Sequence, residues 1–238
     1  MSVIGTRGMM TASRRVPARP PYQNPFSDSQ LQTIEEALLA AWPDVHATAD
    51  DAEVEITARL VRKLDALMND EDEPVPGFTA DIYETLDRGN ELEDYRGKEL
   101  EKRPDMTFRP TGRASNLPGK RHWGLFCECK RIGPTNVAAT YCKQGLVRFI
   151  EGKYAWAVSV AMMIGFARDG YTLPETIDKH FRRKNSPTYN RRKDKLEPAG
   201  QPSQAWVSVH ERSWTYVGDT GGAPGPISVR HIWLPVPG

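Results

Sequence analysis

Three side chains near the middle of the chain have types and a spacing that suit phosphate chemistry. Asp105 follows a proline at the start of the short stretch "PDMTFRP", and Glu128 and Lys130 lie two residues apart in "LFCECKRIG". Because side chains alternate along a strand, Glu128 and Lys130 share one face, and Cys127 and Cys129 share the other. A buried ion pair is costly to maintain for stability alone, which favours a functional role. The alternative is a solvated pair on an edge strand.

Together, these three groups could hydrolyse a phosphodiester bond. Two carboxylates at close range repel each other and are suited to bind a hard divalent cation such as Mg²⁺, or Mn²⁺ in its place. The metal lowers the pKa of a bound water molecule and stabilises charge on a phosphate oxygen. A lysine can orient that water, help to deprotonate it, or neutralise the phosphate. We therefore expect Asp105 and Glu128 to be metal ligands and Lys130 to be the catalytic lysine.

The surrounding sequence predicts the elements that would position these residues. Apolar residues recur at helical spacing in "SDSQLQTIEEALLAAW" and in "ADDAEVEITARLVRKLDALMND". Strands are predicted in "FTADIYETL", "PDMTFRP" and "HWGLFCECKRI", followed by a helix in "TNVAATYCKQGLVRFIEG". The apolar run at 154–167 fits either a strand or a helix, and we predict a helix. Finally, "AWVSVHERSWTYV" and "ISVRHIWLPV" predict a pair of strands near the end of the chain.

The "PD" of Pro104 and Asp105 and the "ECK" that ends at Lys130 resemble the motif of the PD-(D/E)XK, or restriction-endonuclease-like, nuclease superfamily. The interval from Asp105 to Glu128 is 128 − 105 = 23 positions, room for one strand, a loop and half of the next strand. The resemblance covers about residues 51–167. It implies an α/β fold with a central mixed β-sheet flanked by helices, here with a C-terminal β-hairpin extension. It also implies a Mg²⁺-dependent endonuclease.

Members of this superfamily commonly add an acidic residue from the first core helix, and Glu53 and Glu55 are the candidates here. At about 100° per residue, Glu53 lies in line with Leu60, Leu64 and Leu67, on the apolar stripe. Glu55 points roughly the opposite way. We therefore choose Glu53 as a further catalytic residue. The alternative is that Glu53 only favours the N-terminus of its helix electrostatically.

Basic residues and one glutamine further along the chain are candidates to bind a nucleic-acid backbone. Gln144 matches a glutamine often seen near the active site of related nucleases, and Lys143 and Arg148 could approach a phosphate. The segment "DKHFRRKNSPTYNRRKDK" has eight Lys or Arg against two Asp, with two aromatic residues interleaved. For all of these the alternative is an ordinary solvated surface. The candidates in this segment are Arg182, Arg183, Lys184, Arg191 and Arg192.

Composition restricts the class of protein further. The chain has 238 residues, 39% hydrophobic and 26% charged, with a net charge of +1, so a nucleic acid would have to meet a local basic patch. No apolar run reaches the roughly 20 residues of a membrane span. Residues 1–26 have four arginines and no acidic residue, which favours a flexible basic arm over a transit peptide. Three cysteines without a disulfide pattern indicate core packing in a reducing cytoplasm, not a zinc site.

These observations predict one nuclease-like domain over residues 27–238, with a core at about 51–167 and a basic segment and β extension at 178–238. We expect a cytoplasmic, metal-dependent nuclease that hydrolyses DNA, as the effector of a bacterial or phage defence or restriction system. The alternative is a catalytically silent subunit with the nuclease fold that binds nucleic acid or assembles with protein partners. An RNA substrate and a homodimer stay open.

Overall fold

The computed structural model of the chain describes most of residues 24–237. The described residues are 24–86, 88–89, 91–92, 94–97, 103–111, 122–133, 137–183, 187, 189–193, 195–201, 203–216 and 222–237. The expected N-terminal arm therefore lies almost entirely outside the described residues, as does Lys184.

Six strands form one mixed, open sheet in the order β1-β2-β3-β6-β5-β4. The central strands β2, β3 and β6 are parallel, while β1 is antiparallel to β2, β5 to β6, and β4 to β5. The expected α/β class with a mixed sheet is confirmed. The strands are β1 (Met106–Phe108), β2 (Leu125–Ile132), β3 (Val160–Arg168), β4 (Glu197–Pro198), β5 (Trp206–His210) and β6 (Ile227–Val236).

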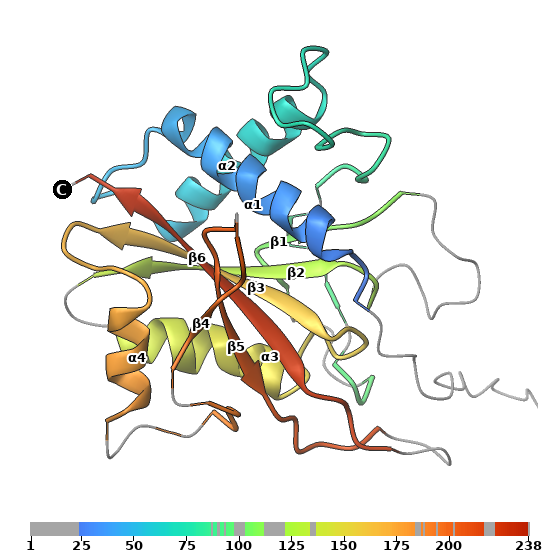
Figure 1. Ribbon diagram of the computed structural model, residues 1–238, viewed down its shortest axis with the longest axis vertical. Helices are drawn as coiled ribbons and strands as arrows, with labels where there is room; N and C mark the ends of the chain where they lie inside the picture. The colour runs from blue at the N-terminus through green and yellow to red at the C-terminus, as the bar shows by residue number, and fades with distance from the viewer. Residues whose placement is uncertain are drawn as a thin grey trace, which may run out of the picture.

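Helices cover both faces of this sheet (Figure 1). On one face lie α1 (Asp28–Ala41) and α2 (Glu53–Met68), joined through the 3₁₀ turn Trp42–Val45. On the other lie a π-helical segment, Val137–Leu146, which continues into α3 (Val147–Ile150), and α4 (Glu175–Phe181). These elements agree with the helices predicted before and after the Glu128 strand. Of the helices in the described ranges, none combines the length and the apolar character needed to cross a membrane.

The buried run at 154–167 forms a strand, β3, so the predicted helix there is wrong. Its pairing explains why the sequence was ambiguous: β3 lies between β2 and β6, and its first eight residues are buried. A parallel strand covered by helices on both faces has no polar side to show, so it reads as an unbroken apolar run.

Two other strand predictions are changed by the structure. The stretch "FTADIYETL" is built from turns, with one isolated bridge between Tyr83 and Pro110, so the predicted strand there is wrong. The predicted C-terminal strands are present as β5 and β6. However, β6 pairs with β3 along nine residues, so this pair is an integral part of the sheet and not an extension of it.

The sheet leaves part of one strand open. The register pairs β1 with only the first three residues of β2, Leu125 to Cys127. Within the described residues, the rest of β2 has a strand neighbour on the β3 side only. Because Asp105 directly precedes β1 and Glu53 begins α2, both residues can reach this open edge.

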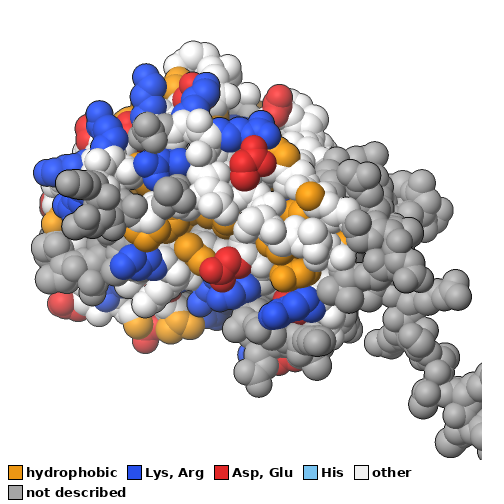
Figure 2. Space-filling view, turned by 90° about the horizontal axis from the view of Figure 1, so that it is seen from below, with side chains coloured by type: hydrophobic (Ala, Val, Ile, Leu, Met, Phe, Trp, Pro, Cys, Tyr) orange, Lys and Arg blue, Asp and Glu red, His pale blue; other side chains and the backbone are white. Residues whose placement is uncertain are grey.

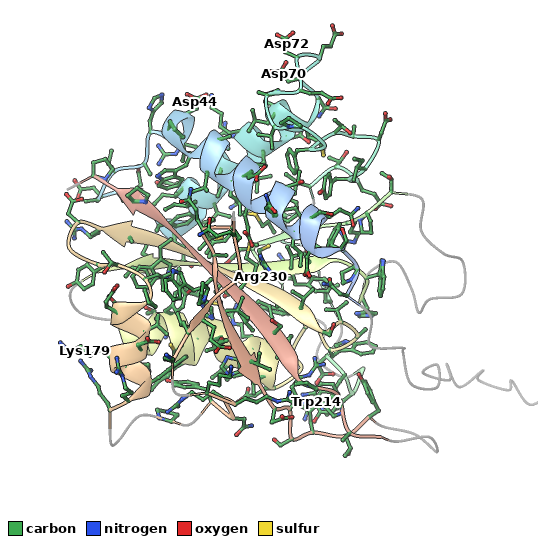
Figure 3. The ribbon with its side chains drawn as sticks, viewed as in Figure 1. Asp44, Asp70, Asp72, Lys179, Trp214 and Arg230 are labelled. Atoms are coloured by element: carbon green, nitrogen blue, oxygen red, sulfur yellow. The ribbon has the colours of Figure 1, made fainter. Side chains whose placement is uncertain are left out.

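A buried ion pair ties α1 to the sheet. The guanidinium of Arg230, near the centre of β6 in Figure 3, donates to Glu35 on α1, and the hydroxyl of Ser203 donates to the other oxygen of Glu35. Glu35 and Arg230 are only 1% and 8% exposed. Each charge therefore depends on the other for the hydrogen bonds that water would otherwise provide.

We predict that Glu35→Gln lowers the free energy of unfolding by about 3–5 kcal/mol, because it leaves the Arg230 charge buried without its counter-ion. Urea unfolding followed by circular dichroism measures this. The matched control is Glu36→Gln on the exposed side of the same helix, where we expect a change within about 0.5 kcal/mol. Equal effects of the two substitutions would contradict the prediction.

Candidate functional site

The structure brings Glu53, Asp105, Glu128 and Lys130 together at the open edge of β2. The Lys130 Nζ atom lies 2.9 Å from Glu53 Oε1, 2.9 Å from Glu128 Oε1 and 3.7 Å from Asp105 Oδ2. The four residues come from α2, from the segment before β1 and from β2 itself. Three carboxylates thus surround one ammonium group.

Two of the carboxylates also saturate the open edge of β2. The Cys129 N–H donates to Asp105 Oδ2 at 2.7 Å, and the Arg131 N–H donates to Glu53 Oε2 at 3.0 Å. The Lys130 ammonium donates to the Cys129 carbonyl at 2.6 Å. These side chains make the hydrogen bonds that a neighbouring strand would otherwise make. Their positions are therefore fixed by the backbone of the strand that carries Glu128 and Lys130.

Glu128 is the most buried member of the cluster, with 0% exposure. Beside Lys130, it accepts a hydrogen bond from Arg148 Nη1 at 2.7 Å and one from the Tyr154 hydroxyl. Arg148 lies on α3, and Tyr154 lies in the turn between α3 and β3. Arg148, predicted to approach a phosphate, is thus also a counter-ion of Glu128.

The sequence interpretation missed Tyr154, because it assigned that residue to a helix. Because β3 (160–168) is parallel to β2, a helical crossover must connect the two strands, and the turn before β3 follows that crossover. The helix that precedes this turn packs against β2, which brings the turn near Glu128. The signal was thus the βαβ topology, and no motif around Tyr154 itself pointed to it.

Burial and charge act on the cluster in opposite directions. Burial raises the pKa of Asp105, and Lys130 offsets part of that rise. Burial also raises the pKa of Glu128, and the nearby Asp105 charge raises it further. Burial of Lys130 disfavours its charge, but Glu128, Asp105 and Glu53 outweigh this effect, so the pKa of the ammonium is raised. Lys130 is therefore charged at neutral pH, and its charge stabilises the ionised carboxylates.

The carboxylate oxygens have the chemistry for a hard divalent cation. Asp105 Oδ2 and Glu128 Oε1 can be no further apart than 6.6 Å, the sum of their 3.7 and 2.9 Å distances to the same nitrogen. In the described part of the chain, no group of three or more His, Cys, Asp or Glu is arranged to hold a metal ion. The Lys130 ammonium lies among these carboxylates, at the point where their oxygens converge.

The two acidic candidates on α2 lie as the helical spacing predicted. Glu53 is half-buried and faces Lys130, whereas Glu55 is exposed and accepts the Ala52 N–H at 3.3 Å at the start of the helix. Glu55 therefore serves the helix N-terminus, where a carboxylate stabilises the unpaired N–H groups. This difference makes the two residues a matched pair for mutation.

The other candidates for nucleic-acid binding lie on the π-helical segment, at the end of α4 and in the segment after α4. Lys143 and Gln144 are exposed on the π-helical segment, and Arg182 and Arg183 are exposed at the end of α4. Two arginines of the segment after α4 make internal contacts. Arg191 donates to the Phe181 carbonyl at 2.7 Å and lies over the Phe181 ring, and Arg192 pairs with Glu211.

The three cysteines are free thiols, buried in the core, as the packing interpretation predicted. Cys127 and Cys129 face the α1 and α2 side of the sheet, and Cys142 faces the α3 side. Burial raises the pKa of all three thiols, that of Cys142 to about 12. They are therefore protonated, apolar packing groups.

Histidines of β5 and β6 belong to a buried hydrogen-bonded chain. His210 Nδ1 lies 2.7 Å from the Tyr189 carbonyl, which only accepts, so His210 Nε2 must accept from Ser208. Ser208 in turn accepts from His231 Nε2, and the Tyr141 hydroxyl donates to His231 Nδ1. Both imidazoles are fully buried and neutral, so neither can contact a phosphate directly.

Comparison of the chain with protein-family models, with curated proteins and with solved structures gave no match. The interpretation of the site therefore depends on its geometry and on the physical chemistry of its residues.

The neutral histidine chain predicts acid-sensitive stability. Burial lowers the pKa of His210 to about 4 and of His231 to about 3, against about 6.5 in an unfolded chain. Between these values the unfolded state binds more protons, so the free energy of unfolding falls as pH falls below about 6.5. Urea unfolding between pH 7.5 and 5 should show this loss, and His231→Gln should reduce its slope.

The control for this slope is the exposed His46, whose backbone φ of 49° tolerates asparagine. We expect His46→Asn to keep the wild-type dependence on pH. Because the raised pKa values of Asp105 and Glu128 act in the opposite direction, the variants decide the result: a His231→Gln variant with the wild-type dependence on pH would contradict the prediction.

Proposed function

We propose that this protein is a metal-dependent nuclease that hydrolyses phosphodiester bonds of DNA. The observation that carries the proposal is the convergence of Glu53, Asp105, Glu128 and Lys130 at the open edge of β2. The resemblance of "PD" and "ECK" to the PD-(D/E)XK motif adds support, since Asp105 directly precedes β1, Glu128 and Lys130 lie on the neighbouring β2, and a helical segment follows.

Asp105 and Glu128 would hold the metal, with Glu53 as a further acidic group. Their oxygens are hard donors that suit Mg²⁺ or Mn²⁺, and two of the three are held rigidly by backbone N–H groups. When bound, such a metal activates a water molecule and stabilises charge on a phosphate oxygen. The raised pKa values of Asp105 and Glu128 reflect burial near like charge, which is the condition that a divalent cation relieves.

Lys130 supplies a positive charge in this proposal. The nearby carboxylates raise the pKa of Lys130 and keep its ammonium protonated. A protonated ammonium cannot accept a proton from water. It is well suited to stabilise an anionic phosphate, and to orient a water molecule as a hydrogen-bond donor. Arg148, half-exposed and bonded to Glu128, adds a second positive charge beside the cluster.

The distribution of charge favours an approach of nucleic acid from the α3 and α4 side. Residues 24–86, which include α1 and α2, contain fifteen acidic and three basic residues. Residues 137–216, which include α3 and α4, contain thirteen Lys or Arg and seven acidic residues. Figure 2 shows Lys and Arg side chains gathered on this lower face, with apolar side chains exposed among them. A phosphate backbone is attracted to this face and repelled by the opposite one.

A second candidate function is favoured by one observation. The oxygens of Glu128 already accept hydrogen bonds from Arg148 and Tyr154, and one of them also pairs with Lys130. If these bonds persist, the fold serves as a catalytically silent subunit that binds nucleic acid or protein partners.

In either case we propose a cytoplasmic protein of a bacterial or phage defence or restriction system, on analogy with the superfamily alone.

Cleavage of plasmid and single-stranded DNA in Mg²⁺ tests the catalytic assignment. We expect Asp105→Asn and Lys130→Ala each to reduce the cleavage rate by about a hundredfold or more, because each removes a group that holds the metal or stabilises the phosphate. Glu53→Gln should reduce it as well. The matched control, Glu55→Gln on the exposed side of α2, should cleave at the wild-type rate.

Cleavage at the same rate by wild type and all four variants would refute the active-site assignment. Intact DNA binding with no cleavage by wild type, in any divalent metal, would favour the silent subunit. The same assay with RNA separates the two nucleic acids.

Metal binding can be measured without DNA. We expect Mg²⁺ to raise the midpoint of thermal unfolding of the wild type, because a ligand that binds only the folded state stabilises it. Asp105→Asn and Glu128→Gln should abolish this rise, and Glu55→Gln should keep it. Lys130→Met should bind Mg²⁺ more tightly than wild type, because the competing ammonium is gone. A rise that is unchanged in Asp105→Asn and Glu128→Gln would place the metal elsewhere.

A further inference from the structure

A concave pocket lies beside α3, on the face of the sheet opposite α1 and α2. This α3 pocket has a volume of about 480 Å³. Its wall includes the apolar side chains Val147, Ile150 and Trp214, and its rim includes the polar side chains Lys143, Asn190 and Ser213. Trp214, at the lower right in Figure 3, comes from the segment after β5. Neither the carboxylate cluster nor the proposed metal site uses this pocket.

The pocket and the carboxylate cluster share one helix. Arg148 points to Glu128, while its neighbour Val147 and the preceding Lys143 line the pocket. Lys143 and Arg148 are five positions apart, which is at most about 7.5 Å along the helix axis. A strand with one phosphate at the cluster can therefore place a nearby nucleotide at the pocket.

The wall of the pocket is held rigidly. The Trp214 indole N–H donates to the Ile150 carbonyl at 3.0 Å, and its ring stacks on Tyr95 with the ring centroids 4.3 Å apart. Gly152 allows the approach of Trp214, since a Cβ atom at Gly152 would lie 2.7 Å from the indole. Trp214 is 9% exposed, with Arg212 also 5.5 Å from its ring centroid, so the wall is rigid and only a small part of the indole faces the pocket. Such preorganisation favours binding.

The chemistry of the pocket matches one nucleotide. A nucleobase has an apolar ring for the wall and a polar edge for the Asn190 and Ser213 side chains, and its phosphate carries the charge that Lys143 attracts. A base that is stacked in a duplex cannot enter such a pocket unless it leaves the stack. An unpaired base enters without that cost.

We infer that the α3 pocket binds one unpaired nucleobase of a single-stranded DNA next to the bond that is hydrolysed. The inference rests on the proposed nuclease function and gives it a substrate class, single-stranded DNA. The basic α3 and α4 face then holds the phosphates on either side of that nucleotide.

Fluorescence anisotropy in EDTA tests the inference, because no hydrolysis then occurs. The probes are a fluorescein-labelled thymidine 12-mer, a 12-mer of the same length in which every nucleotide is abasic, and the matching blunt duplex. We expect the wild type to bind the thymidine 12-mer about fivefold or more tightly than the abasic one, and more tightly than the duplex. Ser213→Trp, an exposed substitution that fills the pocket, should bind the thymidine and abasic 12-mers alike.

Two further variants separate the base from the phosphate. Lys143→Glu should weaken binding of both 12-mers, whereas Lys63→Glu on the acidic α2 side should leave both affinities unchanged. Equal wild-type affinity for the two 12-mers would overturn the inference, and so would a Ser213→Trp variant that keeps the wild-type preference. If either result is found and the wild type still cleaves DNA in Mg²⁺, the nuclease proposal stands without the base pocket. Failure to bind any probe in EDTA would overturn the inference alone, because the cleavage assay in Mg²⁺ tests the nuclease proposal separately.

Discussion

The open edge of β2 is the constraint on which the site depends. A strand edge carries backbone N–H and C=O groups that need partners, and β1, whose first residue pairs with Cys127, does not extend far enough to supply them beyond that residue. Asp105 and Glu53 supply them from two other elements, and Lys130 joins them through its ammonium and the Cys129 carbonyl. The same hydrogen bonds that complete the sheet thus bring acidic groups together, which is otherwise electrostatically unfavourable.

The surrounding fold makes this arrangement stable. The parallel pairing of β2 with β3 requires a helical crossover, and that crossover carries Arg148 and Tyr154 to the buried Glu128. On the opposite face, α2 begins beside the β2 edge and presents Glu53. The cluster therefore contains side chains from both faces of the sheet, and its three carboxylates are balanced by only two cations. Burial and the repulsion among these carboxylates raise the pKa values of Asp105 and Glu128, and a proton or a further cation relieves that repulsion.

Much of this arrangement could be predicted from local patterns in the sequence. Alternation along "LFCECKRIG" separates the charged residues from the buried cysteines, and helical spacing distinguishes Glu53 from Glu55. The rest depended on tertiary pairing. A strand buried on both faces has no periodic polar residues, so β3 resembled a helix, and Tyr154 was missed with it. The position of β6 beside β3 depends on a pairing between residues 68 positions apart, such as Val160 and Ser228 (228 − 160 = 68), which no local pattern records.

In the proposed site, the Lys130 ammonium lies where a divalent cation would bind between Asp105 and Glu128. A crystal structure of the protein grown with Mn²⁺, whose anomalous scattering locates the metal, tests this directly. We expect Mn²⁺ bound to Asp105 and Glu128, with Lys130 moved away from both carboxylates. If Lys130 keeps its bonds to Glu53 and Glu128 while Mn²⁺ binds elsewhere or not at all, the proposed site is wrong.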